Sequence, residues 1–153
     1  MQIVIATIGK LKKQTPEDIL IQDYIKKTRW TVVIKELEEK RALTGDVLKE
    51  AESNRLLDAV PKGSKIVVLD ETGKTPTSRE FAQLLQDWEN SGFSTVSFLI
   101  GGANGHADFL KQQADYKLSF GRMTLPHMLA RVVLSEQIYR AKTIIDGHPY
   151  NKD

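Results

Sequence analysis

The residues with most chemical capacity lie in the last third of the chain, beginning with a glycine-rich loop. Residues 101–105 read GGANG and follow the apolar run that ends at Ile100. Glycine permits positive φ and lets a ligand approach backbone N–H groups closely, but it also makes tight turns. No Gly-Lys-Ser/Thr follows, and the spacing does not fit the dinucleotide fingerprint. ATP and NAD are therefore weak candidates, while a ligand-binding loop and a plain turn both stay open.

A second irregular segment, residues 119–127, reads SFGRMTLPH. Its backbone groups could wrap an adenine while Met123 and Leu125 supply apolar walls. The alternative is an ordinary loop in which Pro126 sets the start of the following helix. For His127, the helix dipole disfavours the charged imidazole, and we favour a structural role.

The third feature is the tail, residues 147–153, in which an imidazole, an aromatic ring and a cation follow a glycine helix stop. Chain ends usually fray, although Pro149 stiffens this one. A frayed end and a functional tail both stay open. A fourth candidate is Asp70 in the run VLDETGK, which could contact a ribose or an amine, or could be a solvated turn residue.

Composition bounds the class of protein. The 153 residues, 41% hydrophobic and 27% charged, suit one globular domain spanning residues 1–153. The sequence has no cysteine, which excludes disulfides, thiolate zinc sites and cysteine nucleophiles and suits a reducing compartment. The first residues lack a basic region and are too short an apolar run for a signal or a membrane span. We expect a cytoplasmic protein without membrane contact.

The charge balance is almost even, with 22 Lys and Arg against 20 Asp and Glu, a net charge of +2. That excess is too small to indicate nucleic acid by itself. Any RNA partner must therefore be recognised by a local patch.

Apolar runs of strand length alternate with stretches of helical spacing, which predicts an α/β fold with a largely parallel sheet. Five strands and five helices fit. We expect strands at 2–8, 31–37, 65–70, 95–100 and 116–120. Four of the helices are placed at about 16–28, 46–60, 78–92 and 127–146.

Helix starts are marked by Thr15-Pro16 and by the capping-box pattern from Thr77 to Glu80. Ligands of such sheets bind beyond the carboxyl ends of the strands, which is where the glycine-rich loops fall. The last helix carries more apolar surface than one face needs, which indicates either burial against the sheet or a subunit interface.

The motifs IGGANGH, SFGRMTLPHMLARVVLSEQIYRA, HPYNKD and LDETGK together resemble the bacterial large-subunit rRNA pseudouridine N3-methyltransferases of the SPOUT superfamily. The resemblance covers essentially the whole chain. It implies a parallel-sheet α/β fold whose C-terminal region is threaded into a trefoil knot, an exception to the usual rule against knots. It also implies a homodimer, which would account for the apolar last helix.

The resemblance further implies that S-adenosylmethionine is the methyl donor, bound bent in the knot without any metal. The tail of one subunit would reach an active site completed by its partner. The residues that this assigns to the cofactor are Leu69, Gly101, Gly102, Gly121, Arg122, Met123, Thr124, Leu125 and Pro126.

The implied reaction is methyl transfer to N3 of a pseudouridine in 23S rRNA, within the large subunit or an assembled ribosome. N3 must lose its proton and lie in line with the methyl group and sulfur. Arg131 or Lys152 could stabilise charge on the flanking carbonyl oxygens. Tyr150 or His148 could position the base or pass its proton to water.

RNA contact would come from loop and helix lysines through salt-sensitive phosphate contacts. These include Lys10, Lys12, Lys13 and Lys74.

The sequence departs from the family in its tail, where a usual Tyr-His-Arg or Tyr-His-Lys run reads Tyr150-Asn151-Lys152. An amide can hydrogen-bond a base edge but cannot take a proton near neutral pH, so we assign Asn151 no acid–base role. Two rival interpretations follow: a non-catalytic ribosome- or RNA-binding module with the same fold, and a flavodoxin-like domain that binds a flavin or phosphate at the same edge.

Overall fold

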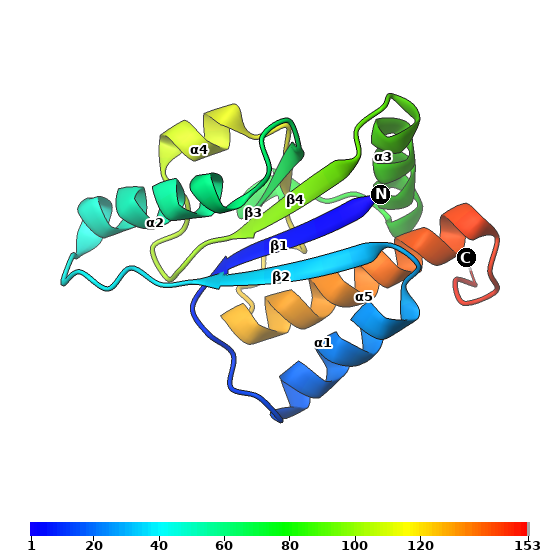
Figure 1. Cartoon of the computed structure of the whole chain (residues 1–153), viewed down its shortest axis with the longest axis horizontal. Helices are drawn as coiled ribbons and strands as arrows, with labels where there is room; N and C mark the ends of the chain where they lie inside the picture. Colours follow the sequence, from blue (N-terminus) through cyan, green and yellow to red (C-terminus); the bar gives the residue numbers. More distant parts are fainter. Residues whose placement is uncertain (153) are drawn as a thin grey trace. The chain divides into compact units, whose positions relative to one another are not determined.

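A computed structural model describes residues 1–152 of the chain (Figure 1). Over these residues it has five strands and five helices in α/β order. The strands are β1 (Gln2–Ile8), β2 (Thr31–Leu37), β3 (Lys65–Lys74), β4 (Thr95–Ile100) and β5 (Tyr116–Leu118). The helices are α1 (Pro16–Lys27), α2 (Gly45–Ala59), α3 (Ser78–Asn90), α4 (Asp108–Gln113) and α5 (His127–Asp146).

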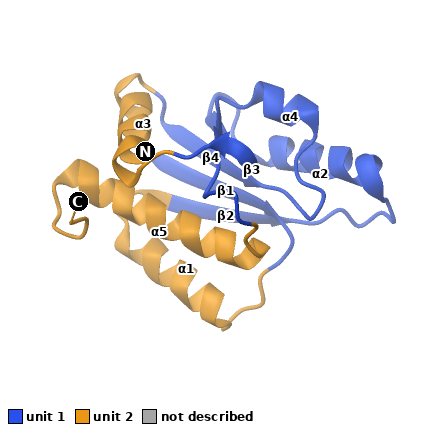
Figure 2. Ribbon diagram, turned by 180° about the vertical axis from the view of Figure 1, so that it is seen from behind, with its two compact units in different colours: residues 1–10, 32–75, 93–123 blue, residues 11–31, 76–92, 124–153 orange. Residues whose placement is uncertain are grey.

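The chain divides into two compact units, coloured separately in Figure 2. Unit 1 comprises residues 1–10, 32–75 and 93–123 and holds the sheet with α2 and α4. Unit 2 comprises residues 11–31, 76–92 and 124 onward and holds α1, α3, α5 and the tail. The single domain that composition suggests stays a prediction.

The five strands of the sheet lie in the order β2-β1-β4-β3-β5. The pairings β1–β4, β3–β4 and β3–β5 are parallel, which confirms the α/β class expected from the sequence. In the central strand β4, Phe98 lies opposite Ile5 of β1 and Val67 of β3. Five of its six residues are buried, as its continuous apolar run requires.

The helices of unit 1, α2 and α4, cover one face of the sheet (Figure 1). Their apolar side chains pack on alternate residues of the strands, because successive strand residues point to opposite faces. The buried residues of this core are Val4, Ala6, Ile8, Leu56, Val60, Val68, Leu99 and Leu110.

Strand β3 is four residues longer than its apolar run predicts, because a bulge extends its pairing with β5. Leu118 lies opposite both Leu69 and Lys74, so the residues between them are folded out of the ladder. At Gly73 an added Cβ would lie 2.6 Å from the Lys117 carbonyl oxygen. Only glycine fits there, which explains its place in LDETGK at the carboxyl end of β3.

Unit 2 is a set of three helices in which α5 packs against both α1 and α3. The predicted caps are confirmed. The Thr15 hydroxyl accepts a hydrogen bond from the Asp18 N–H at 3.3 Å. Thr77 and Glu80 form a reciprocal capping box at 3.1 and 2.9 Å. Helix α5 ends at Gly147, whose φ of 72° is the left-handed conformation that favours glycine at a helix end.

Most predicted bounds agree with the structure, and the strands 2–8, 31–37 and 95–100 and the helix 127–146 coincide with it. Strand β5 ends at 118 rather than 120. The fifth helix, which periodicity did not place, is α4, whose six residues are too few to carry a helical period. Among residues 1–152, no helix is both long and apolar enough to cross a membrane.

Candidate functional site

The glycine loop after β4 is a tight turn anchored by helix α2. Gly102 and Gly105 form an isolated bridge, and the Gly105 N–H donates to the Gly102 carbonyl at 3.0 Å. The far end of the loop is fixed where the Ala107 N–H donates to the buried Ser53 hydroxyl at 2.9 Å. A Cβ on Gly101 would lie 3.1 Å from the Gly105 carbonyl oxygen. That contact would be tight, and Gly105 has a φ of 76°, the left-handed conformation that favours glycine, so the turn itself accounts for these glycines.

A buried carboxylate that the sequence analysis missed lies against this loop. Glu52 of α2 is only 8% exposed, and a Cβ on Gly102 would lie 2.9 Å from its Oε1. Oε1 accepts no hydrogen bond. Burial raises the pKa of this carboxyl, and the charge of Glu39 adds to the effect. The available signal was spacing, since Leu48, Glu52 and Leu56 recur every four residues on one helix face.

His106, at the end of the same loop, is a neutral imidazole. It is 3% exposed, and its Nε2 lies 3.1 Å from the Leu99 carbonyl oxygen. Burial lowers the pKa of His106. Because a carbonyl only accepts, Nε2 carries the proton and Nδ1 is an acceptor, which is buried and has no partner.

Asp70, at the end of β3, is held as a carboxylate. Burial raises the pKa of Asp70, but the Thr72 N–H at 3.2 Å and the Lys111 ammonium at 3.5 Å outweigh that effect and leave the pKa below its usual value. Its side chain is ion-paired within unit 1 and is not a free solvated charge.

Within unit 1 the structure brings together the predicted cofactor segments that follow three neighbouring strands. Because β4, β3 and β5 are adjacent and parallel, Leu69, the pair Gly101-Gly102 and Gly121 all lie at the carboxyl edge of the sheet. Ser119 shapes the last of these loops, since its hydroxyl accepts from the Gly121 N–H and donates to the Gly121 carbonyl, both at 3.0 Å.

The remaining predicted cofactor residues are exposed. They form the continuous stretch Arg122, Met123, Thr124, Leu125 and Pro126. Met123 is 85% exposed and Leu125 is 37% exposed. Two apolar side chains facing solvent on a loop are available to cover an apolar ligand surface.

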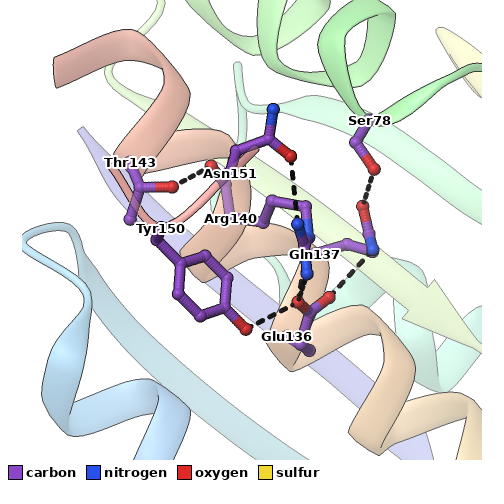
Figure 3. A network of polar contacts seen from close by, with 7 residues as sticks. All are labelled: Ser78, Glu136, Gln137, Arg140, Thr143, Tyr150 and Asn151. Atoms are coloured by element: carbon purple, nitrogen blue, oxygen red, sulfur yellow. Dashed lines mark hydrogen bonds and ion pairs between the residues drawn. The ribbon is translucent and has the colours of Figure 1, made fainter. Parts of the chain in front are cut away.

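The tail is not frayed over residues 148–152, because it docks on α5 through the network in Figure 3. The Tyr150 hydroxyl donates to Glu136 Oε1 at 2.9 Å. Arg140 donates to the same oxygen through Nε at 2.9 Å and Nη2 at 2.6 Å, and through Nη1 to Asn151 Oδ1 at 3.0 Å. The ring of Tyr150 meets that of Tyr139 edge-on, with centroids 4.7 Å apart.

This docking fixes the chemistry of two tail residues. Burial raises the pKa of Tyr150 well above its usual value, and the hydrogen bond to Glu136 adds to the effect, so the side chain is a neutral phenol. Asn151 is a partner of Arg140, while its buried Nδ2 has no acceptor. Neither residue is a base.

The predicted catalytic residues divide between two places on α5. His148, Tyr150 and Lys152 gather at the tail, where His148 Nδ1 accepts from the Tyr150 N–H at 3.2 Å. Arg131 is 3% exposed in the second turn of α5. It lies five residues before Glu136, about 140° around a helix of 3.6 residues per turn. One chain therefore does not bring Arg131 onto the face that holds Tyr150.

No cluster of three or more metal-binding side chains is found in the part of the chain that the structure describes. Two ion pairs lie near these segments, between Asp70 at the end of β3 and Lys111 of α4, and between Glu136 and Arg140 of α5 under the tail.

Comparison with known proteins gives a match along the whole chain. The family model described as "Predicted SPOUT methyltransferase" matches residues 1–151. The "Ribosomal RNA large subunit methyltransferase H" of Paramagnetospirillum magneticum is 49% identical over 99% of both chains. The proteins of the same name from Rhodospirillum centenum and Neisseria meningitidis are 40% and 41% identical over 99% and 100% of both chains.

A solved structure, the SpoU methyltransferase AviRb of Streptomyces viridochromogenes in complex with AdoMet, aligns with a TM-score of 0.45 and 12% identity. The alignment covers 96% of this chain and 61% of that chain.

The docking of the tail yields a prediction. Replacing Glu136 by Ala removes the acceptor shared by Tyr150 and Arg140, and hydrogen bonds to a charged group contribute about 1.5–3 kcal/mol each. We expect amide hydrogen exchange in residues 148–152 to become at least about tenfold faster. Glu38→Ala, which removes an exposed carboxylate, is the control. Unchanged exchange in Glu136→Ala would show that the network does not hold the tail.

Proposed function

The chain belongs to the SPOUT methyltransferase family, and from that premise we propose that it transfers a methyl group from S-adenosylmethionine to N3 of a pseudouridine in 23S ribosomal RNA. The family match over residues 1–151 and the rRNA methyltransferase names of its relatives support this proposal. The observation that carries it within the structure is the convergence of three loops at the carboxyl edge of β4, β3 and β5.

The residues of these loops fit such a cofactor. When bound, S-adenosylmethionine supplies a methyl group activated by a positively charged sulfur. Gly101 and Gly102 would offer backbone groups to it at the end of β4, with Leu69 and Gly121 at the ends of the neighbouring strands. Following the family resemblance, the exposed residues Arg122, Met123, Thr124, Leu125 and Pro126 are also proposed as cofactor contacts, with Met123 and Leu125 as the apolar ones.

The chemical step needs orientation and charge stabilisation more than a strong base. The cofactor would supply the methyl group to N3 and leave as S-adenosylhomocysteine, and the N3 proton would pass to water. Lys152 and Arg131 would stabilise the negative charge on the flanking carbonyl oxygens. Tyr150, whose hydroxyl donates to Glu136 in the free chain, or His148, whose Nδ1 accepts from the Tyr150 N–H, would position the base or pass its proton to water.

We further propose that the enzyme is a homodimer and that its C-terminal region forms the trefoil knot of the family. Two observations support a dimer. The proposed catalytic residues Arg131 and Tyr150 lie on different faces of α5. Unit 2 also exposes large apolar side chains, namely Ile19, Leu20, Leu125 and Leu129. A second copy would bring one tail to the Arg131 region of its partner.

The dimer is tested by sedimentation equilibrium. We expect a mass of about twice the 17.3 kDa of the chain. Replacing Leu129 by Asp places a charge on an exposed part of α5 and should shift the mass toward one chain, while Val47→Asp, at an exposed site in unit 1, should not. A single-chain mass for the unaltered protein would contradict the proposal.

The RNA partner is 23S rRNA within the large subunit or the assembled ribosome, which also implies a cytoplasmic enzyme. A net charge of +2 provides little electrostatic affinity for isolated RNA. This small charge favours recognition of a folded ribosomal particle by its shape. Lysines such as Lys10 and Lys74 would add phosphate contacts.

A methyl-transfer assay on ribosomes that lack the modification tests the function. We expect one methyl group per large subunit. Tyr150→Ala and Lys152→Ala should each lower the rate by about 100-fold or more, since removing an oriented donor or a stabilising charge costs that much, while cofactor still binds. Lys62→Ala, at an exposed site outside the loops and tail, is the control. Cofactor or ribosome binding without methyl incorporation would favour the non-catalytic module instead.

A further inference from the structure

The glycine loop is bordered by two buried acceptors with nothing to accept. One is Glu52 Oε1, beside Gly102, and the other is His106 Nδ1. His106 also borders Gly101, since a Cβ on that glycine would lie 3.2 Å from His106 Cε1. Leaving buried acceptors unpaired costs free energy, and for a carboxylate the cost is large.

The local structure supplies no cation to Glu52. The charge that acts on it is that of another carboxylate, Glu39, whose own oxygens accept from Arg41 at 3.0 Å and Arg55 at 2.8 Å. In α4, the ammonium of Lys111 is paired with Asp70. Glu52 occupies a position on the buried face of α2 where an apolar residue would be expected. Its unpaired carboxylate therefore lowers the free energy of unfolding of the ligand-free protein.

The anchored loop beside Glu52 makes this residue suited to contact a ligand. The neighbouring residue Ser53 is fully buried and anchors the loop at Ala107. Ser53 thus ties α2 to one end of the glycine loop, and the preceding residue Glu52 lies beside Gly102 at the other end. Because Glu52 is only 8% exposed beside this anchored loop, its carboxylate lies at the loop before a ligand arrives, which is what a preorganised binding group requires.

We infer that Glu52 binds the positively charged amino group of the cofactor's methionine part, with His106 Nδ1 as a second acceptor at the same loop. The inference rests on the proposed function. An ammonium group offers three N–H donors and a full positive charge, and so satisfies both a carboxylate and an imidazole nitrogen. The sulfonium carries charge but no N–H, and would leave both acceptors unpaired. Glu52 and His106 are binding residues in this account and take no part in the transfer step.

Calorimetric binding measurements with three ligands distinguish which charged group of the cofactor Glu52 contacts. S-adenosylmethionine has both the ammonium and the sulfonium, S-adenosylhomocysteine has only the ammonium, and 5′-methylthioadenosine has neither. In Glu52→Gln we expect the first two to bind more weakly by the same factor, about tenfold or more, and the third to bind unchanged. Glu50→Gln, which removes an exposed carboxylate from the same helix, should change none of them.

Each other result overturns the inference. Weakening of S-adenosylmethionine alone would assign Glu52 to the sulfonium, equal weakening of all three would make its role structural, and no weakening would remove it from the site. If the unaltered protein binds none of the ligands, the proposed function fails as well. If it binds them in this pattern but methylates no ribosomes, only the proposed function fails.

Stability of the free protein gives a second readout. Because burial raises the pKa of Glu52, its charged form weakens the fold above that pKa, and the penalty disappears at pH values below the ordinary range of glutamate, where both folded and unfolded states are protonated. Glu52→Gln should therefore raise the urea midpoint at pH 8 and have little effect at pH 4. A lowered midpoint at pH 8 would mark Glu52 as a structural residue and contradict the inference.

Discussion

The parallel pairing of β4 with β3, and of β3 with β5, is the constraint on which the candidate site depends. It directs the carboxyl ends of three neighbouring strands to one edge, so loops that begin near residues 70, 101 and 119 meet although they are far apart in sequence. The bulge between Leu69 and Lys74, which Gly73 makes sterically possible, lets β3 stay paired with β5 beyond the end of its apolar run. Helix α2 then fixes the central loop through Ser53, and leaves Glu52 beside its glycines.

The elements were predictable from sequence where local chemistry determines them. The strand 95–100 is an apolar run between turns, and α1 and α3 begin at threonine caps whose partners lie three residues away. Features that depend on distant residues were missed. The extension of β3 requires Lys117, and the burial of Glu52 requires a loop about 50 residues further along the chain.

The candidate site shows the same division. Composition marked the glycine loop and the segment 119–127, but could not decide between a turn and a ligand site. The structure explains the glycines sterically, and the unpaired acceptors around them supply the chemical reason to propose a ligand. The sequence could not show whether the tail is frayed or docked. The hydrogen bond from Tyr150 to Glu136 that docks it joins residues fourteen positions apart, on either side of the end of α5. Asn151, the residue at which the sequence departs from the family pattern that the resemblance implies, accepts from Arg140 through its amide oxygen within that network.

Hydrogen exchange with and without S-adenosylmethionine tests the central claim most directly, because it reports where the cofactor binds without altering the chain. The account predicts slower exchange in residues 101–107 and 119–126 on addition of the cofactor, with α1 unchanged. Protection confined to α1 and α3, or no protection at saturating cofactor, would contradict a cofactor site at the carboxyl edge of β4, β3 and β5.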